Sequence, residues 1–228
     1  MRTITPEYSV ISSRPVGLAT SEVLKKTYFL LSLTILFSAV TALLPMLGLL
    51  PIMLNPLISI VGMFGLLFAA QATSRSQWGI FWTFAFTGFM GYTLAPTLIY
   101  YLSFYTNGAA LIWVALLATA ITFAALSIYA AFSKEDFSYL GGMLFVGITI
   151  ALLLSIMGFF LRVEWFSVLV SGLFLLIVSG LVLLRTNMIV NGGEDNYVLA
   201  TIGLYVSILN MFLSILQILG FLSGSRRS

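Results

Sequence analysis

Residues 197–222 of the chain read YVLATIGLYVSILNMFLSILQILGFL, which is 26 residues without a charged side chain. A helix that crosses a bilayer needs about 20 predominantly apolar residues. An α-helix also satisfies its backbone hydrogen bonds within one segment, as the lipid interior requires. This stretch therefore predicts a transmembrane helix.

Six further apolar segments precede it. The whole chain has 228 residues, of which 61% are hydrophobic and 7% are charged, whereas soluble proteins carry about 25% charged residues. Short connectors make successive helices antiparallel neighbours. We therefore predict an all-α fold, an integral membrane bundle of seven transmembrane helices. The first six segments are residues 27–44, 56–70 (with a start as early as 52), 78–102, 109–132, 140–161 and 166–184.

Polar ends flank this predicted domain. Residues 1–26 are expected to form a polar cytoplasmic segment, residues 27–222 the transmembrane domain and residues 223–228 a short tail. The first apolar segment begins too far from the N-terminus for a secretory signal peptide. The net charge of +3 is spread along the chain and predicts no nucleic-acid surface. The bilayer is the partner that composition indicates, and no feature sets an oligomeric state.

Basic residues indicate the orientation, because Lys and Arg favour cytoplasmic loops. With seven crossings, the N-terminus shares one side with the second, fourth and sixth connectors. That side would hold seven of the ten basic residues: Arg2, Arg14, Lys25, Lys26, Arg75, Lys134 and Arg185. The other would hold Arg162, Arg226 and Arg227. This bias predicts a cytoplasmic N-terminus and a C-terminus on the opposite side.

The ionisable residues argue against an enzyme. The chain has neither Cys nor His, and all seven acidic residues lie outside the expected spans. Intramembrane carboxylates are the usual mark of proton or cation pathways, and a Ser nucleophile needs an activating base. We therefore predict no catalytic residues, no metal site and no cofactor.

One face of the last segment is small or polar. Its members are spaced alternately by four and three residues, which places them on a single face of a helix: Asn196, Ala200, Gly203, Ser207, Asn210, Ser214 and Gln217. Such a face allows close helix packing, or it lines a polar pathway. Both interpretations remain open, with Gly203, Ser207, Asn210, Ser214 and Gln217 as candidate site residues.

Small residues also recur every three or four positions in two other segments. The members are Thr83, Thr87, Gly91 and Ala95 in the third segment, and Gly147, Ala151, Ser155 and Gly158 in the fifth. These faces predict close contacts between helices. Pro96 predicts a kink in the third helix.

Arg185 ends the sixth segment. It is either a membrane-interface anchor or a counter-charge, for Glu194 or Asp195 or for an anionic partner. Residues 191–193, Asn-Gly-Gly, predict a tight turn.

Several of these stretches resemble the Bax inhibitor family of membrane proteins, in particular its bacterial YccA-type branch. The matching stretches are KTYFLLSLT (26–34), AFTGFMGYTLAP (85–96), YLGGML (139–144), NGGEDNY (191–197), ATIGLYVSILN (200–210) and QILG (217–220). The resemblance implies a seven-helix bundle with the last helix near its centre. It also implies the bacterial inner membrane, and hence a periplasmic C-terminus.

The resemblance implies two functions. The bacterial branch is associated with a membrane-bound ATP-dependent protease, whose activity its members modulate, and other members are associated with calcium leak. Calcium-leak members carry an aspartate pair that acts as a pH latch. The corresponding positions here are Arg185 and Ser207, neither of which is acidic, so this chain forms no such latch there. Our first hypothesis is therefore a modulator of membrane-protein quality control. The alternatives are a passive cation or small-solute pathway and a purely structural membrane protein.

Overall fold

The computed structural model describes residues 16–52, 55–133, 135, 137–161 and 163–224. Within these ranges the chain is helical and forms no β-strand, which confirms the all-α prediction. Its elements are α1 (Val16–Met46), α2 (Pro56–Ala72), α3 (Trp78–Phe104), α4 (Gly108–Phe132), the short 3-10 helix η1 (Phe137–Tyr139), α5 (Leu140–Leu161), α6 (Glu164–Val190) and α7 (Tyr197–Ser223).

Five of the described helices are long and apolar enough to cross a membrane, namely α1 from Ser21 onward, α4, η1 with α5, α6 and α7. Helix α2 is shorter, at 17 residues. Helix α3 has 27 residues, but its many Thr, Gly, Tyr and Trp residues lower its hydropathy. Length and composition therefore account for five of the seven predicted crossings.

Helix α2 begins at Pro56, the first of the two predicted starts. Pro56 occupies the first turn, and the Asn55 side chain accepts a hydrogen bond of 3.0 Å from the Leu57 amide. Proline suits this position because its missing N–H would have no partner inside the helix. The start as early as residue 52 was wrong.

Three predicted boundaries need correction. Helix α1 begins at Val16, eleven residues before the predicted start at residue 27, and it continues through Pro45 to Met46. Helix α6 runs six residues past the predicted end at residue 184, so Arg185 lies inside a helix and not in a connector. Glu22 and Glu164 fall within two segments that are long and apolar enough to span a membrane, Ser21–Met46 and Glu164–Val190, and not outside the candidate spans as predicted. Glu164 sits in the first turn of α6, where the helix dipole favours negative charge.

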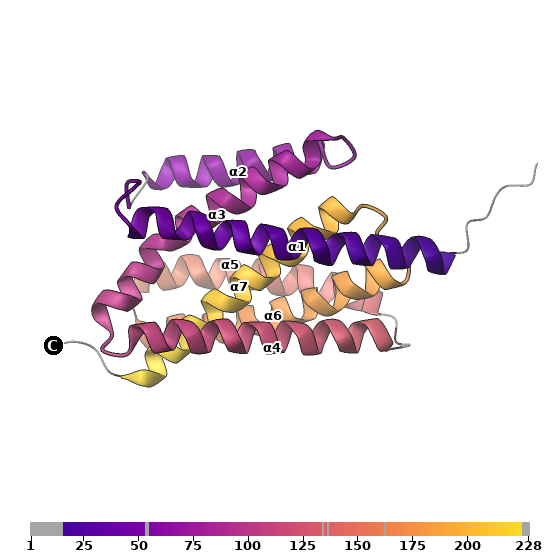
Figure 1. The fold of residues 1–228 in the computed structure, drawn as a ribbon. Coiled ribbons are helices and arrows are strands. Elements are labelled where there is room, and N and C mark those ends of the chain that lie inside the picture. Colours follow the sequence, from indigo (N-terminus) through magenta and orange to yellow (C-terminus); the bar gives the residue numbers. More distant parts are fainter. Residues whose placement is uncertain (1–15, 53–54, 134, 136, 162, 225–228) are drawn as a thin grey trace, which may run out of the picture.

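Helix α7 is the most buried of the five candidate spans. Inside the protein, 67% of its most apolar window is buried, against 11% for α5. It packs against α1, α4, α6 and α3, while α2 packs on α3 and α5 packs on α6. Figure 1 shows α7 running obliquely behind α1, with α5 on the far side of the bundle. The small-residue stripe allows these helices to approach α7 closely.

Contacts between connectors define one end of the bundle. The Arg75 guanidinium lies 3.4 Å from the Asp195 carboxylate, which joins the α2–α3 and α6–α7 connectors. The Asn187 amide donates a hydrogen bond of 3.0 Å to the Glu135 carbonyl, which joins α6 to the α4–α5 connector. These contacts confirm that the second, fourth and sixth connectors share one end.

Several basic residues in the orientation argument lie outside the described residues. These are Arg2, Arg14, Lys134, Arg162, Arg226 and Arg227. The orientation therefore stays a prediction.

Candidate functional site

The first half of the α7 stripe is occupied by contacts within the protein. The Asn196 side chain caps the helix by accepting hydrogen bonds from the amides of Val198 (2.9 Å) and Leu199 (3.3 Å). The Ser207 hydroxyl donates to the Gly203 carbonyl at 3.0 Å. Ala200, Gly203 and Ser207 are all buried. These residues have the geometry of a packed helix surface.

Arg185 lies across this packed surface. Its guanidinium contacts Gly203 so closely that a Cβ at residue 203 would overlap it. Its Nε is buried and has no hydrogen-bond partner among the described residues. Glu194 is the acidic group whose charge acts on it, while Asp195 pairs with Arg75 instead. Arg185 is half-buried as a whole, and the absence of a side chain at Gly203 provides the space that its guanidinium occupies.

The two latch positions therefore lie in neighbouring parts of α6 and α7. Arg185 covers Gly203, one helical turn before Ser207. A guanidinium and a hydroxyl thus occupy the two positions that the resemblance assigned to the carboxylate pair, and that correspondence stays a prediction. The two groups offer no shared proton of the kind that two neighbouring carboxylates hold.

A hydrogen-bond network that the sequence did not suggest joins three helices. The Tyr205 hydroxyl of α7 donates to the Thr87 carbonyl of α3 at 3.1 Å. It also lies 2.6 Å from the Ser38 hydroxyl of α1. Because the Tyr205 proton is already used, Ser38 is the donor in that second bond. Thr83, Thr87, Gly91 and Ala95 are all buried, which confirms the predicted close-contact face of the third helix.

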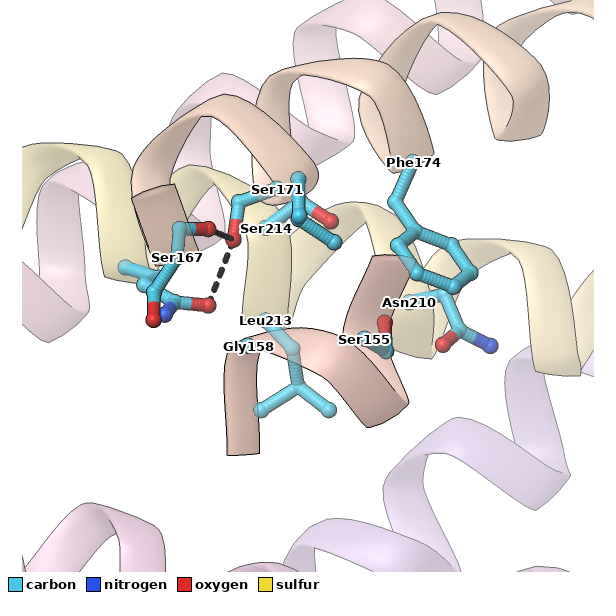
Figure 2. Close-up of a pocket in the computed structure, with 10 residues that line it drawn as sticks. Ser155, Gly158, Ser167, Ser171, Phe174, Asn210, Leu213 and Ser214 are labelled. Carbon is cyan, nitrogen blue, oxygen red and sulfur yellow. Dashed lines mark hydrogen bonds between the residues drawn. The ribbon is translucent and has the colours of Figure 1, made fainter. Parts of the chain in front are cut away.

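An open cleft lies beside the second half of α7, between α5, α6 and α7. It has a volume of about 390 Å³, and we call it the α5–α7 cleft (Figure 2). Two small or polar faces noted in the sequence meet here, one from α7 and one from α5. The lining residues are Ser155, Gly158, Ser167, Val170, Ser171, Phe174, Asn210, Leu213, Ser214 and Gln217.

Polar groups of the α5–α7 cleft are only partly satisfied by the protein. The Asn210 amide nitrogen donates to the Val206 carbonyl at 2.8 Å, while its amide oxygen has no partner among the described residues. The Ser171 hydroxyl lies within hydrogen-bond distance of the Gln217 amide oxygen and the Ser167 carbonyl. Ser155 and Ser214 have no hydrogen-bond partner for their hydroxyls in the described part of the chain. Figure 2 shows the Asn210 amide next to Ser155 and Phe174.

A second cleft, of about 420 Å³, lies between α3, α6 and α7; we call it the tyrosine cleft. The rings of Tyr101 and Tyr105 stack with their centroids 5.1 Å apart. It shares Ser167, Leu213 and Gln217 with the α5–α7 cleft, so the two are adjacent. The lining residues are Thr97, Tyr100, Tyr101, Tyr105, Glu164, Ser167, Val168, Leu213, Gln217 and Phe221.

Pro96 immediately precedes Thr97, and α3 continues through it to Phe104. The kink at Pro96 stays a prediction.

Sequence reasoning identified the α7 wall of the clefts but missed the α6 wall. Ser167, Ser171 and Phe174 follow the same four-then-three spacing as the α7 stripe. That spacing could have revealed a second face directed at α7. The aromatic wall formed by Tyr101 and Tyr105 depends on the α3–α4 turn and had no comparable signal.

These observations define the class of protein: a helical membrane protein whose clefts are lined mainly by hydroxyl, amide and aromatic groups. Among the described residues, no group of three Asp, Glu, His or Cys side chains could hold a metal ion. Residues 20–224 match the family described as "Inhibitor of apoptosis-promoting Bax1". The chain belongs to this family, the Bax inhibitor family, as the resemblance implied.

Individual relatives extend over nearly the whole chain. The "Modulator of FtsH protease YccA" of Escherichia coli K12 is 44% identical over 208 residues, covering 90% of this chain and 93% of the relative. The "Inner membrane protein YccA" of E. coli O6:H1 shows the same identity and coverage. An uncharacterized membrane protein of Vibrio cholerae is 39% identical over 225 residues, covering 97% of this chain and 99% of the relative.

Proposed function

We propose that this chain modulates membrane-protein turnover in a bacterial inner membrane by acting on a membrane-bound ATP-dependent protease. The observation that carries the proposal is the 44% identity to a relative named as a modulator of the FtsH protease, over 90% of the chain. A relative of the same identity is named as an inner membrane protein. The match covers 90% of this chain and 93% of that relative.

The proposed protein crosses the membrane seven times around α7. At 1.5 Å per residue, the 27 residues of α3 extend about 40 Å and the 17 residues of α2 about 25 Å. The second, fourth and sixth connectors share one end of the bundle, which is consistent with alternating crossings. In this arrangement the N-terminus is cytoplasmic and the C-terminus periplasmic.

The modulator is proposed to act by binding and not by catalysis. In this orientation the N-terminal segment that precedes the candidate span at Ser21 lies on the cytoplasmic side, and terminal segments are where proteases usually engage a chain. The folded membrane domain, residues 27–222, would then stay bound to the protease. The chain would thereby compete with the protease's substrates for binding.

Deletion of residues 1–21 tests this proposal. The full-length chain is expected to co-purify with the protease, and the deletion variant is expected to lose most of that association. Both proteins are compared for thermal stability, so that an unfolded variant is recognised. Absence of association by the full-length chain, together with unchanged turnover of membrane substrates in a deletion strain, would refute the proposal.

A second candidate function is a passive pathway for small solutes or cations, and the two clefts favour it. They bring hydroxyl and amide groups of α7 next to open space. The test is flux of calcium, monovalent ions and small neutral solutes into liposomes that contain the purified protein. Asn210→Leu is expected to reduce any flux through the α5–α7 cleft. An unchanged flux would mean that the stripe serves packing alone.

A further inference from the structure

The α5–α7 cleft presents polar groups that have no hydrogen-bond partner among the described residues, and in the proposed topology it lies within the membrane. Asn210 lies 13 residues before the end of α7 at Ser223, which is about 20 Å along the helix. Ser155 lies six residues before the end of α5 at Leu161. In the described structure the hydroxyls of Ser155 and Ser214 and the amide oxygen of Asn210 have no protein partner. Unsatisfied polar groups at hydrocarbon depth are costly.

The chemistry of the lining limits what fills the cleft. All ten lining residues are uncharged, so a phosphate, an ammonium group or a metal ion would find no opposite charge there. The available groups are hydroxyls and amides, which pair with other hydroxyls and amides. Gly158, Ser155 and Ser214 are small, as is usual where two transmembrane helices approach closely. The occupant is therefore an uncharged polar group carried on a surface that packs closely.

The position of α5 sets the route of access. Helix α5 packs mainly on α6, and only 11% of its most apolar window is buried. Its exposed side chains include Leu153 and Ile156, which do not line the cleft and which face lipid in a membrane. The cleft is open and not enclosed. An occupant can thus arrive sideways, from within the membrane.

We infer that the α5–α7 cleft is a docking site for a transmembrane helix of the membrane protease, one that carries Ser, Thr, Asn or Gln on a small-residue face. The helix lies along the opening and inserts one or more polar side chains, which pair with Ser155, Asn210 and Ser214. This inference rests on the proposed function and names the surface that would mediate it. Interhelical hydrogen bonds of this kind contribute about 0.6–2 kcal/mol each within a membrane.

The test exploits the absence of cysteine from the chain. Ser214→Cys places a single thiol in the cleft, and Leu153→Cys places one on the lipid face of α5 as the matched control. Each thiol is coupled to a photo-crosslinker, and the protein is reconstituted into vesicles with the purified protease. We expect the probe at residue 214 to crosslink to a transmembrane segment of the protease several-fold more efficiently than the probe at residue 153. Ser155→Leu, which fills the cleft from the opposite wall, is expected to reduce that yield several-fold.

Other outcomes overturn the inference. Equal yields from the two probes, products with lipid or a second copy of this chain alone, or free reaction of the thiol at residue 214 with a hydrophilic reagent in the complex would each do so. Co-purification of unlabelled protein from the same vesicles separates the two proposals. Association without a cleft crosslink rejects the docking site and leaves the modulator function intact. No association rejects both. Unfolding of Ser155→Leu is checked from its thermal stability.

Discussion

At the scale of single residues, Gly203 and Arg185 depend on each other. The guanidinium occupies the space that a Cβ on residue 203 would need. We predict that Gly203→Ala lowers the free energy of unfolding by about 1–3 kcal/mol, the usual cost of overpacking. In the Arg185→Ala background the overlap is gone, and the same substitution is expected to cost less than about 1 kcal/mol or to stabilise.

The free energy of unfolding in mild detergent is measured for the wild type, the two single variants and the double variant. Gly172→Ala is the matched control, because a Cβ at residue 172 of α6 has nothing within 4 Å. An equal cost of Gly203→Ala with and without Arg185 would contradict the contact between the two residues.

Tyr205 provides a second prediction at this scale. Tyr205→Phe removes the hydroxyl that donates to the Thr87 carbonyl and accepts from Ser38. Each such bond contributes about 0.5–1.5 kcal/mol net, so we expect a loss of about 1–3 kcal/mol in unfolding free energy. Tyr129→Phe serves as the control, since Tyr129 is exposed. If both variants unfold at the same temperature, the network does not contribute to stability.

At the scale of elements, the end of α6 holds the α4–α5 connector in place. Asn187 is buried, donates to the Glu135 carbonyl at 3.0 Å and accepts from the Phe137 amide at 3.4 Å. We predict that Asn187→Ala destabilises the protein by about 1–3 kcal/mol and speeds hydrogen exchange in the connector around Phe137. Asn107→Ala, at an exposed helix start without a side-chain cap, should change neither. Unaltered exchange near Phe137 would show that this anchor is unimportant.

Some helix boundaries followed from the sequence and others did not. The limits of α5 were predicted correctly, because short polar connectors flank a long apolar run. The end of α6 was missed because Arg185 was interpreted as a boundary, although Gly203 on another helix accommodates its charge. A side chain that is tolerated through a distant glycine leaves no local signal.

The candidate site divides in the same way. Periodicity placed Asn210, Ser214 and Gln217 on one face, and it placed Ser155 and Gly158 on another. These two faces meet at one cleft because of the orientation in which α5 packs on α6. Only the packing of the whole bundle determines that orientation. The bond between Ser38 and Tyr205 joins residues 167 positions apart, and neither residue stood out in the sequence.

At the scale of the whole molecule, the number of crossings is testable with single cysteines. Ser76→Cys and Asn191→Cys lie at one end of the bundle, and Asn107→Cys lies at the other. In intact cells, a reagent that reaches only the periplasmic side is expected to label residue 107 alone, because α3 separates residues 76 and 107 in the proposed topology. Labelling of residues 76 and 107 from the same side would show that α3 does not cross the membrane.

The central claim, a modulator of a membrane protease, is tested most directly by the rate of proteolysis. Purified protease and a membrane-protein substrate are reconstituted into vesicles with increasing amounts of this chain, and ATP-dependent loss of the substrate is followed over time. We predict that degradation slows as the ratio of this chain to protease rises, and that deleting residues 1–21 weakens the effect. The same rate of degradation at every ratio would contradict the claim.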